Sequence, residues 1–334
     1  MSELPEQAAE QRAKQGVEQR EVVLEVEGLV KRYDSFTAVD RLSFAVHRGE
    51  IFGLLGPNGA GKTTTIRIVM DIFKADEGQV RVLGQPPEAV RSRTGYLPEE
   101  RGLYRDQKVL DVLVYLAELK GTPRSEGRDR AMHWLDRVGL AEWAGKKVKD
   151  LSRGMQQKVQ FVASLVHDPD LLILDEPFQG LDPVNVELLK ELIWELQAGG
   201  KTVVLSAHQM NLVEALCDRI VLINRGRAVL YGPLEEIKRE YSPRAVHLRT
   251  AAPLDGLPPH VVRAEEQGDG SYLLELGDIS PQALLRYLVE RDVPVISFDV
   301  AQLPLEEIFI RVVQGEGPAG APGATQEPKG GDDR

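Results

Sequence analysis

A glycine-rich turn between an apolar run and an amphipathic segment constrains the fold of this chain more than any other feature. Ile51 to Leu55 is an apolar run, and the turn from Gly56 to Gly61 follows it directly. Behind the turn, apolar residues recur at helical spacing; these are Ile66, Val69, Met70 and Phe73. The pattern therefore predicts a strand, a loop and a helix in that order.

The spacing within this turn suits a phosphate group. Gly56 and Gly61 bracket four residues and are followed by Lys62 and Thr63, which matches the phosphate-binding loop pattern. A loop without bulky side chains lets backbone N–H groups surround an anion, and the helix N-terminus adds partial positive charge. We expect Lys62 to reach the terminal phosphates and the Thr63 hydroxyl to ligate Mg²⁺. The residues predicted to bind a nucleotide here are Gly56, Pro57, Asn58, Gly59, Ala60, Gly61, Lys62, Thr63 and Thr64.

Composition limits the remaining classes of function. The chain has 334 residues and a formal net charge of −11, which argues against nucleic-acid binding through a basic surface. Its single cysteine, Cys217, excludes an intramolecular disulfide and fits a reducing, cytosolic compartment. No apolar run approaches the ~20 residues needed to cross a bilayer, so any membrane role is expected to pass through a partner. Residues 1–20 and 315–334 are predicted to be a disordered leader and a disordered tail.

The order of the segments predicts a large α/β domain over residues 21–243. Strands are expected within 22–46 and at 79–83, 171–174, 202–206 and 220–223. Helical patterns alternate with the later strands, which favours a mostly parallel sheet with helices on both faces. Two further helical patterns, at 109–119 and 128–140, predict a helical subdomain over about 101–167. Residues 244–314 are predicted to form a small α+β domain with a hairpin at 261–276.

Two acids end the apolar run Leu171 to Leu174. A carboxylate at the end of a strand beside a phosphate loop can hold Mg²⁺, and we assign that role to Asp175. Glu176 is then placed to polarise a water for attack on the γ-phosphate. A salt-bridged strand end is the structural alternative, and the phosphate loop favours catalysis.

A short segment between these two sites carries a family resemblance. Leu151-Ser152-Arg153-Gly154-Met155 resembles the Leu-Ser-Gly-Gly-Gln signature of ATP-binding cassette (ABC) transporter ATPases, and the match spans roughly residues 21–243. The resemblance implies a P-loop NTPase fold of the ABC type. It also implies that Ser152 and Gly154 face the γ-phosphate bound by an opposite subunit. Arg153 and Met155 depart from the common residues, and Arg153 is expected to add positive charge near that phosphate.

The resemblance assigns further residues one at a time. Tyr33 resembles the aromatic residue on which adenine stacks; a half-buried strand tyrosine is the alternative. Glu99 occupies the position where many members carry a glutamine that contacts Mg²⁺ or the water, with Glu100 as the other register and a plain surface acid as the alternative. His208 resembles the histidine that bonds the γ-phosphate and holds the attacking water. Gly180-Leu181-Asp182 resembles the loop between subunits, and Asp182 also suits a helix N-cap.

The resemblance implies an ATP- and Mg²⁺-dependent motor of a membrane exporter. Its partners would be a second copy or a related subunit, arranged head to tail, and an integral membrane permease, with the chain on the inner face of the membrane. The segments 99–104 and 154–159 resemble the sodium-extrusion and drug-export branch, and residues 244–314 resemble the accessory domain that follows some bacterial exporter ATPases. Regulation is one expected role of this domain, and added dimer contact or stability is the alternative. The alternatives are a soluble ABC-type ATPase acting on ribosomes or DNA, and a phosphoryl-transferring kinase. The first commonly has two cassettes or a long coiled coil, and the second does not explain the signature.

Overall fold

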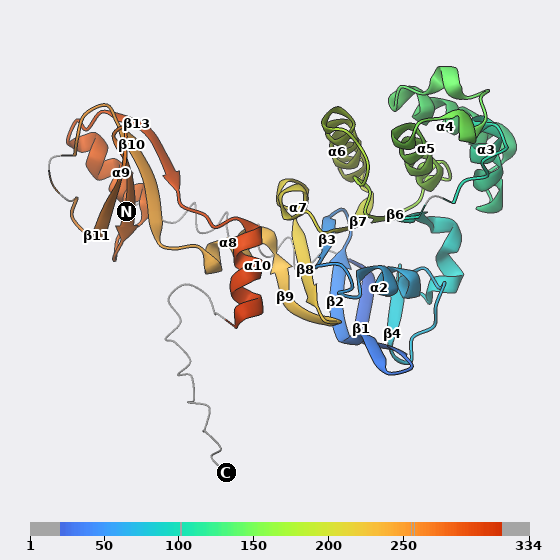
Figure 1. Ribbon diagram of the computed structural model, residues 1–334, viewed down its shortest axis with the longest axis horizontal. Coiled ribbons are helices and arrows are strands. Elements are labelled where there is room, and N and C mark those ends of the chain that lie inside the picture. The colour runs from blue at the N-terminus through green and yellow to red at the C-terminus, as the bar shows by residue number, and fades with distance from the viewer. Residues whose placement is uncertain (1–20, 101, 255, 257, 316–334) are drawn as a thin grey trace, which may run out of the picture. The chain divides into compact units, whose positions relative to one another are not determined.

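The computed structural model describes residues 21–100, 102–254, 256 and 258–315 (Figure 1). The predicted leader, residues 1–20, and the predicted tail beyond Gly315 lie outside the described residues. The chain divides into two units, and the boundary in the sequence lies between Leu234 and Glu235. The sequence predicts this change of domain somewhat later, at residues 243–244.

A six-stranded sheet forms the centre of the first unit, with the strand order β5-β6-β7-β3-β8-β9. Its first five strands in this order are parallel, and β9 pairs antiparallel with β8. Every residue of β3, β6 and β7 is buried, as expected of parallel strands that are covered on both faces. The strands are β3 (Ile51–Leu55), β5 (Thr94–Leu97), β6 (Leu171–Asp175), β7 (Thr202–Ala207), β8 (Arg219–Asn224) and β9 (Arg227–Pro233).

A separate three-stranded antiparallel sheet packs beside the first one, with the order β2-β1-β4. Its strands are β1 (Val22–Tyr33), β2 (Phe36–His47) and β4 (Glu77–Val82). The apolar alternation at 22–46 predicts the strands but does not reveal that they form their own sheet. Helix α2 (Lys62–Val69) lies between the sheets, because Ile66 shares one apolar core with Leu24 of β1 and Phe52 of β3.

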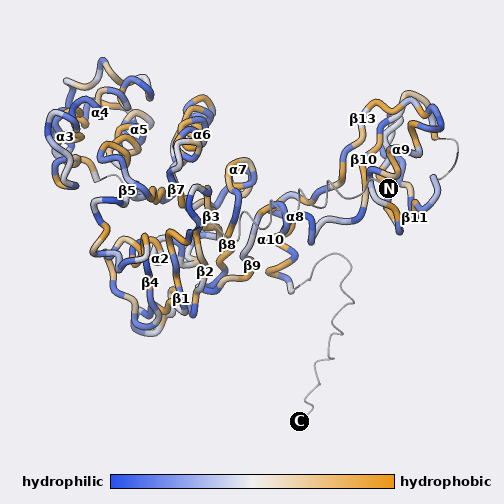
Figure 2. The backbone as a smooth tube through the Cα atoms, turned by 180° about the vertical axis from the view of Figure 1, so that it is seen from behind, coloured by the Kyte–Doolittle hydropathy of each residue, from blue (hydrophilic) through white to orange (hydrophobic). Residues whose placement is uncertain are grey.

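The helices of the first unit cover the parallel sheet on both faces. Helices α6 (Pro183–Ala198) and α7 (Met210–Leu216) lie on the face opposite α2 (Figures 1 and 2). The predicted α/β architecture is therefore confirmed. The 3-10 segment η1 (Pro87–Arg93) and the two edge strands of this sheet, β5 and β9, were not predicted.

Three helices gather in a helical subdomain at the β5–β6 end of the sheet (Figure 1). They are α3 (Val109–Leu119), α4 (Arg124–Arg137) and α5 (Arg153–Leu165), with 3-10 turns η2 (Ala141–Trp143) and η3 (Val148–Asp150) before α5. Helix α4 begins directly after Pro123, earlier than the apolar pattern at 128–140 predicts, because its first turn is polar.

The second unit is built on a four-stranded antiparallel sheet with the order β11-β12-β10-β13. Leu284 and Leu288 of α9 pack on one face of this sheet in a core of their own. The predicted hairpin turns at Asp269, whose φ is 53°. The elements are α8 (Leu234–Tyr241), β10 (Ala245–Thr250), β11 (Val261–Gly268), β12 (Ser271–Leu276), α9 (Pro281–Glu290), β13 (Val295–Val300) and α10 (Leu305–Gln314).

Candidate functional site

The glycine-rich loop joins the end of β3 to the start of α2, and its backbone is held by close neighbours. Gly56 has a φ of 152°, and a Cβ there would lie 2.3 Å from the carbonyl oxygen of Ile223. Gly61 has a φ of 107°, and a Cβ there would lie 2.4 Å from the carbonyl oxygen of Ala38. Both contacts are with backbone, which cannot move aside, so only glycine fits. The loop therefore presents its N–H groups in a conformation that the fold determines.

The N-terminus of α2 carries the features of an anion site. Gly61 provides no side-chain cap, and no acidic residue lies in the first turn. The unpaired N–H groups of a helix N-terminus attract anions, and this effect is strongest where no side chain occupies them. Lys62, which is 6% exposed, donates from Nζ to the Gly56 carbonyl at 2.7 Å. Its ammonium thus lies against the loop at the point where the sequence predicts phosphate.

Asp175 lies at the end of β6 with its side chain fully buried. Its Oδ1 accepts from Ser206 Oγ at 2.5 Å and from Thr63 Oγ1 at 3.5 Å, whereas its Oδ2 is buried with no hydrogen-bond partner among the described residues. Burial raises the pKa of this carboxyl above its ordinary value; the bond from Ser206 opposes the rise and the charge of Glu99 adds to it.

The two carboxylate oxygens of Asp175 suit a hard divalent cation. An orphaned buried carboxylate oxygen beside the Thr63 hydroxyl is the kind of oxygen-donor set that Mg²⁺ binds. No group of three or more His, Cys, Asp or Glu side chains that could hold a metal occurs in the described part of the chain. Mg²⁺ at this position would therefore take further oxygen ligands from a bound phosphate or from water, as it usually does.

Glu176 is fixed from three directions. Its backbone N–H donates to Ser206 Oγ at 3.0 Å, and its Oε2 lies 2.9 Å from His208 Nδ1. Its Oε1 lies 3.7 Å from the Lys62 ammonium. Glu176 also has a φ of 51°, a left-handed value that favours glycine, and such backbone strain concentrates at functional sites. Lys62, Glu176 and His208 are thereby brought together.

Ser206 is a site residue that the sequence reasoning missed. It is fully buried at the end of β7 and stands opposite Asp175 in the strand register. Its hydroxyl donates to the Asp175 carboxylate and accepts from the Glu176 N–H, so one side chain orients both acids. The available signal was a serine that ends an apolar strand two residues before His208.

Glu99 follows β5 and is exposed. Its charge raises the pKa of Asp175, and it adds to the rise that burial causes in the pKa of Tyr96, to about 12. Glu100 instead lies 4.0 Å from Arg67. Of the two registers considered, Glu99 is the one whose charge acts on the buried acid.

The other predicted residues lie apart from this cluster. Helix α5, which begins at the signature, is grouped with α3 and α4 and away from α2 (Figure 1). Ser152 caps α5 by accepting from the Met155 N–H at 3.3 Å, and Gly154 lies near Leu181. Tyr33 is 42% exposed at the end of β1, with the Lys31 ammonium 5.6 Å from its ring centroid.

The helix-cap alternative for Asp182 is confirmed. Its Oδ1 accepts from the backbone N–H of Asn185 at 3.0 Å, and Pro183 occupies the first turn of α6. Bonding to Asn185 lowers the pKa of Asp182 below its ordinary value. Its expected role between subunits remains a prediction.

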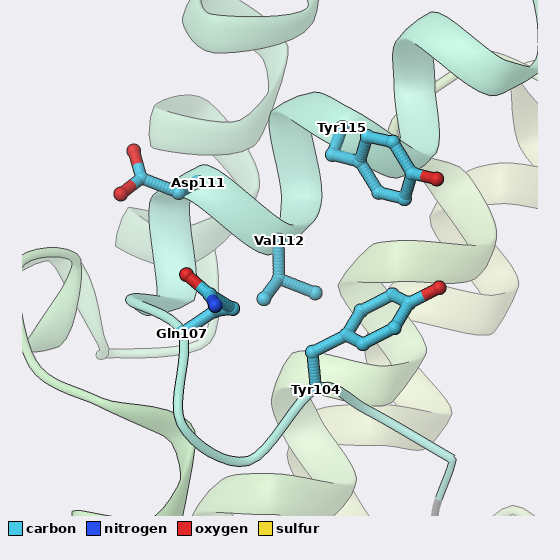
Figure 3. A pocket seen from close by; sticks show the side chains of 5 residues that line it. All are labelled: Tyr104, Gln107, Asp111, Val112 and Tyr115. Carbon is cyan, nitrogen blue, oxygen red and sulfur yellow. The ribbon is translucent and has the colours of Figure 1, made fainter.

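A cavity of about 300 Å³ lies in the helical subdomain, and neither Asp175 nor Glu176 lines it (Figure 3). Figure 3 shows the rings of Tyr104 and Tyr115 next to each other at one side of it, and their centroids are 5.9 Å apart in an edge-to-face arrangement. Its remaining lining residues are Gln107, Asp111 and Val112.

Comparison with known families accounts for most of the chain. Residues 39–179 match the model described as "ABC transporter". Residues 232–313 match the model described as "ATP-binding protein DrrA1-3-like, C-terminal domain".

Two curated relatives align along nearly their whole length. The uncharacterized ABC transporter ATP-binding protein YhaQ of Bacillus subtilis is 39% identical over 294 residues, covering 87% of this chain and 98% of that protein. Nod factor export ATP-binding protein I of Ralstonia nicotianae is 36% identical over 308 residues, covering 88% and 94%.

Solved structures of ABC transporter subunits superpose on 65–66% of the chain. An ATP-binding subunit of an ABC transporter superposes with a TM-score of 0.62 at 33% identity, over 65% of this chain and 92% of the other. CbiO1 from Clostridium perfringens, part of the transporter complex cbiONQ, superposes with a TM-score of 0.59 at 29% identity, over 66% and 91%.

Proposed function

The chain belongs to the ATP-binding subunits of ABC transporters, and on that premise we propose that it hydrolyses ATP in a head-to-tail pair of subunits to drive export through a membrane permease. Members of this family are P-loop ATPases that work as dimers with a permease. The exporter direction is supported by the name of the Nod factor export relative and by the match to the DrrA1-3-like C-terminal domain.

The observation that carries the proposal is the convergence of five side chains from α2, β6 and the end of β7. Thr63 bonds Asp175, and both Lys62 and His208 lie against the carboxylate of Glu176. A phosphate-binding lysine, an oxygen ligand pair, a carboxylate base and a histidine at one strand edge form the constellation that phosphoryl transfer to water needs.

Each group has a defined task in the proposed reaction. The loop N–H groups and Lys62 bind the β- and γ-phosphates of ATP, and Tyr33 stacks on the adenine. Thr63 and Asp175, with Glu99 nearby, would hold Mg²⁺, and the ion would neutralise charge on the phosphate oxygens. Glu176 accepts a proton from the water whose oxygen attacks the γ-phosphorus, and ADP leaves. His208 keeps Glu176 oriented and donates towards the γ-phosphate.

The second subunit completes the site in this proposal. Ser152 and Gly154 lie at the N-terminus of α5, apart from the phosphate loop of their own chain, so they are available to the nucleotide of a partner. A second copy or a related subunit placed head to tail brings this helix terminus to the γ-phosphate. ATP then stabilises the closed pair, and loss of the γ-phosphate releases it.

The membrane permease is the other partner in the proposal. No helix in the described part of the chain is long and apolar enough to span a bilayer. We place the permease contact at the tyrosine-lined cavity of the helical subdomain, which follows the Glu99 segment in the chain and offers two exposed aromatic rings. This arrangement puts the subunit at the inner face of the membrane. A partner with several apolar spans should copurify with it from detergent-solubilised membranes.

Replacing Glu176 by glutamine tests the proposed chemistry. The amide keeps the size of the side chain but accepts no proton, so hydrolysis should fall by roughly 10²–10⁴-fold while ATP binding persists. With ATP, the variant should accumulate as a dimer in analytical ultracentrifugation. Glu100→Gln is the matched control, because Glu100 lies near Arg67 rather than among Lys62, Asp175 and His208. A Glu176→Gln variant that hydrolyses ATP at the normal rate would show that Glu176 is not the base.

A further inference from the structure

Helix α5 holds the backbones of both segments that carry the catalytic acids. Gln160 donates from Nε2 to the carbonyls of Pro98 and Glu100, each at 3.0 Å. Gln157, one turn earlier, donates from Nε2 to the carbonyl of Pro177 at 3.2 Å. Both glutamines are only 4% exposed, so these bonds are protected from water.

The bonded carbonyls lie immediately beside the two acids. Pro98 and Glu100 flank Glu99, so Gln160 holds the backbone on both sides of that residue. Pro177 directly follows Glu176. The amide orientation follows from the partners, because two carbonyl acceptors require the NH₂ group to face them.

The strand that leads to Glu99 also packs directly on this helix. A Cβ at Gly95 of β5 would lie 2.2 Å from the carbonyl oxygen of Ser164 near the end of α5. Contact this close leaves little freedom for β5 to shift along the helix.

The other end of α5 is its N-terminus, where Ser152 and Gly154 of the signature form what we call the signature edge. A Cβ at Gly154 would lie 3.8 Å from Leu181 Cδ2, and Asp182 acts electrostatically on Lys158, whose pKa burial lowers. The helix therefore lies against the chain just after Glu176 at two points, Pro177 and Leu181. One rigid element connects the signature with the segments of Glu99 and Glu176.

We propose that Gln157 and Gln160 are positioning residues that fix Glu99 and Glu176 relative to the signature edge. When that edge contacts the nucleotide of a partner, the helix fixes the positions of Glu99 and Glu176 in the chain's own site. The two ATP sites of the pair are thereby coupled. The inference rests on the proposed function, because it needs those acids to act on ATP. It adds two residues that touch neither nucleotide nor metal.

Gln156 provides an internal comparison. It lies on the same helix, is half-buried and also donates from Nε2 to two carbonyls, Val148 at 3.2 Å and Leu151 at 3.0 Å. Those carbonyls belong to the helical subdomain and do not adjoin Glu99 or Glu176. Loss of its bonds removes similar interactions without releasing either acid.

The test compares Gln157→Met, Gln160→Met and Gln156→Met by steady-state ATP hydrolysis. Methionine keeps the side-chain length and removes the donors. For Gln157→Met and Gln160→Met we expect kcat to fall about 10-fold or more with KM for ATP within about two-fold, because a small displacement of a reacting group is costly. Gln156→Met should keep both parameters within about two-fold of the unsubstituted protein.

Several outcomes overturn the inference. Either variant retaining normal kcat, or losing no more than Gln156→Met, shows that its glutamine does not position an acid; a raised KM at unchanged kcat assigns a binding role instead. If Gln160→Met does not fold, Gln160→Glu takes its place; its kcat should recover as the pH is lowered, because only the protonated carboxyl donates. An unsubstituted protein that binds no ATP would overturn the proposed function itself, and direct ATP titration separates that case.

Discussion

The N-termini of α2 and α5 are both proposed to face a γ-phosphate, the first in its own chain and the second in a partner, yet they are built differently. Gly61 leaves the start of α2 without a side-chain cap, whereas Ser152 caps α5 through the Met155 N–H. Neither helix has an acidic residue in its first turn. The backbone of the α2 site is locked by its neighbours before any ligand binds. At the α5 site the Met155 N–H is already bonded to the Ser152 hydroxyl, which can still donate its own O–H to a ligand.

Alanine substitutions at one glycine of each terminus should separate the two sites most strongly. At Gly61 a Cβ would lie 2.4 Å from a backbone oxygen at a φ of 107°, so Gly61→Ala should cost at least about 2 kcal/mol of unfolding free energy. The displaced loop donors should lower ATP affinity roughly 100-fold or more. Urea unfolding and ATP titration of the isolated subunit measure both effects.

Gly154→Ala is the counterpart in α5. Its Cβ would meet only Leu181 Cδ2, at an ordinary contact distance of 3.8 Å, and alanine is favoured over glycine within a helix. The free subunit should therefore keep its stability and its ATP affinity, while ATP-dependent pairing weakens. If Gly154→Ala destabilises the free subunit as Gly61→Ala does, the two termini do not differ in the way described.

The fold was largely predictable where one physical signal dominated. The apolar run into Asp175 and Glu176 predicts a buried parallel strand, and glycines before Lys62 predict a tight loop and a helix. Strand β5 was missed because it has only four residues, including Gly95, and its pairing with β6 is visible only in three dimensions. The separate antiparallel sheet was missed because alternation reveals a strand and not its neighbours.

The site divides in the same way. Lys62, Asp175 and Glu176 stand in local patterns whose chemistry can be named from the sequence. Ser206, Gln157 and Gln160 act through contacts with distant segments, and no spacing in the sequence connects Gln160 with Pro98. Polar residues that orient others are hidden from a single sequence because their partners are chosen by the fold.

Ser206→Ala tests whether the stability of the site at the start of α2 depends on the titration of Asp175. Thr63 in the first turn of α2 bonds Asp175, whose folded pKa is raised above its ordinary value of 3.8. A raised folded pKa means that the native state holds the proton more tightly, so stability falls as pH rises from below 3.8 through the folded pKa. Ser206→Ala removes a bond that favours the carboxylate and should extend this fall to higher pH.

The expected loss for Ser206→Ala is about 1–3 kcal/mol near neutral pH and smaller in acid, as measured by urea unfolding over a pH series. Ser164→Ala is the matched control, since its buried hydroxyl donates to the Phe161 carbonyl and has no ionisable partner among the residues that the structure describes. That control should cost the same at every pH. A pH-independent difference for Ser206→Ala would show that Asp175 does not titrate with folding.

The smallest expected effect concerns the charge at the start of α5. Arg153 is exposed, and an exposed ionic contact contributes about 0.2–1 kcal/mol, so Arg153→Gly should weaken ATP-dependent dimerisation only roughly two- to five-fold. The loss should shrink at high salt, because screening removes the same attraction from the unsubstituted protein. Arg128→Ala, an exposed arginine on α4 in the same subdomain, controls for net charge. Sedimentation of the Glu176→Gln forms with ATP at two salt concentrations measures these differences. Unchanged dimerisation in Arg153→Gly would show that the α5 terminus attracts the partner's phosphate through its backbone and Ser152 alone. The N-terminus of α5 would then resemble that of α2 more than its departure from the family signature suggests.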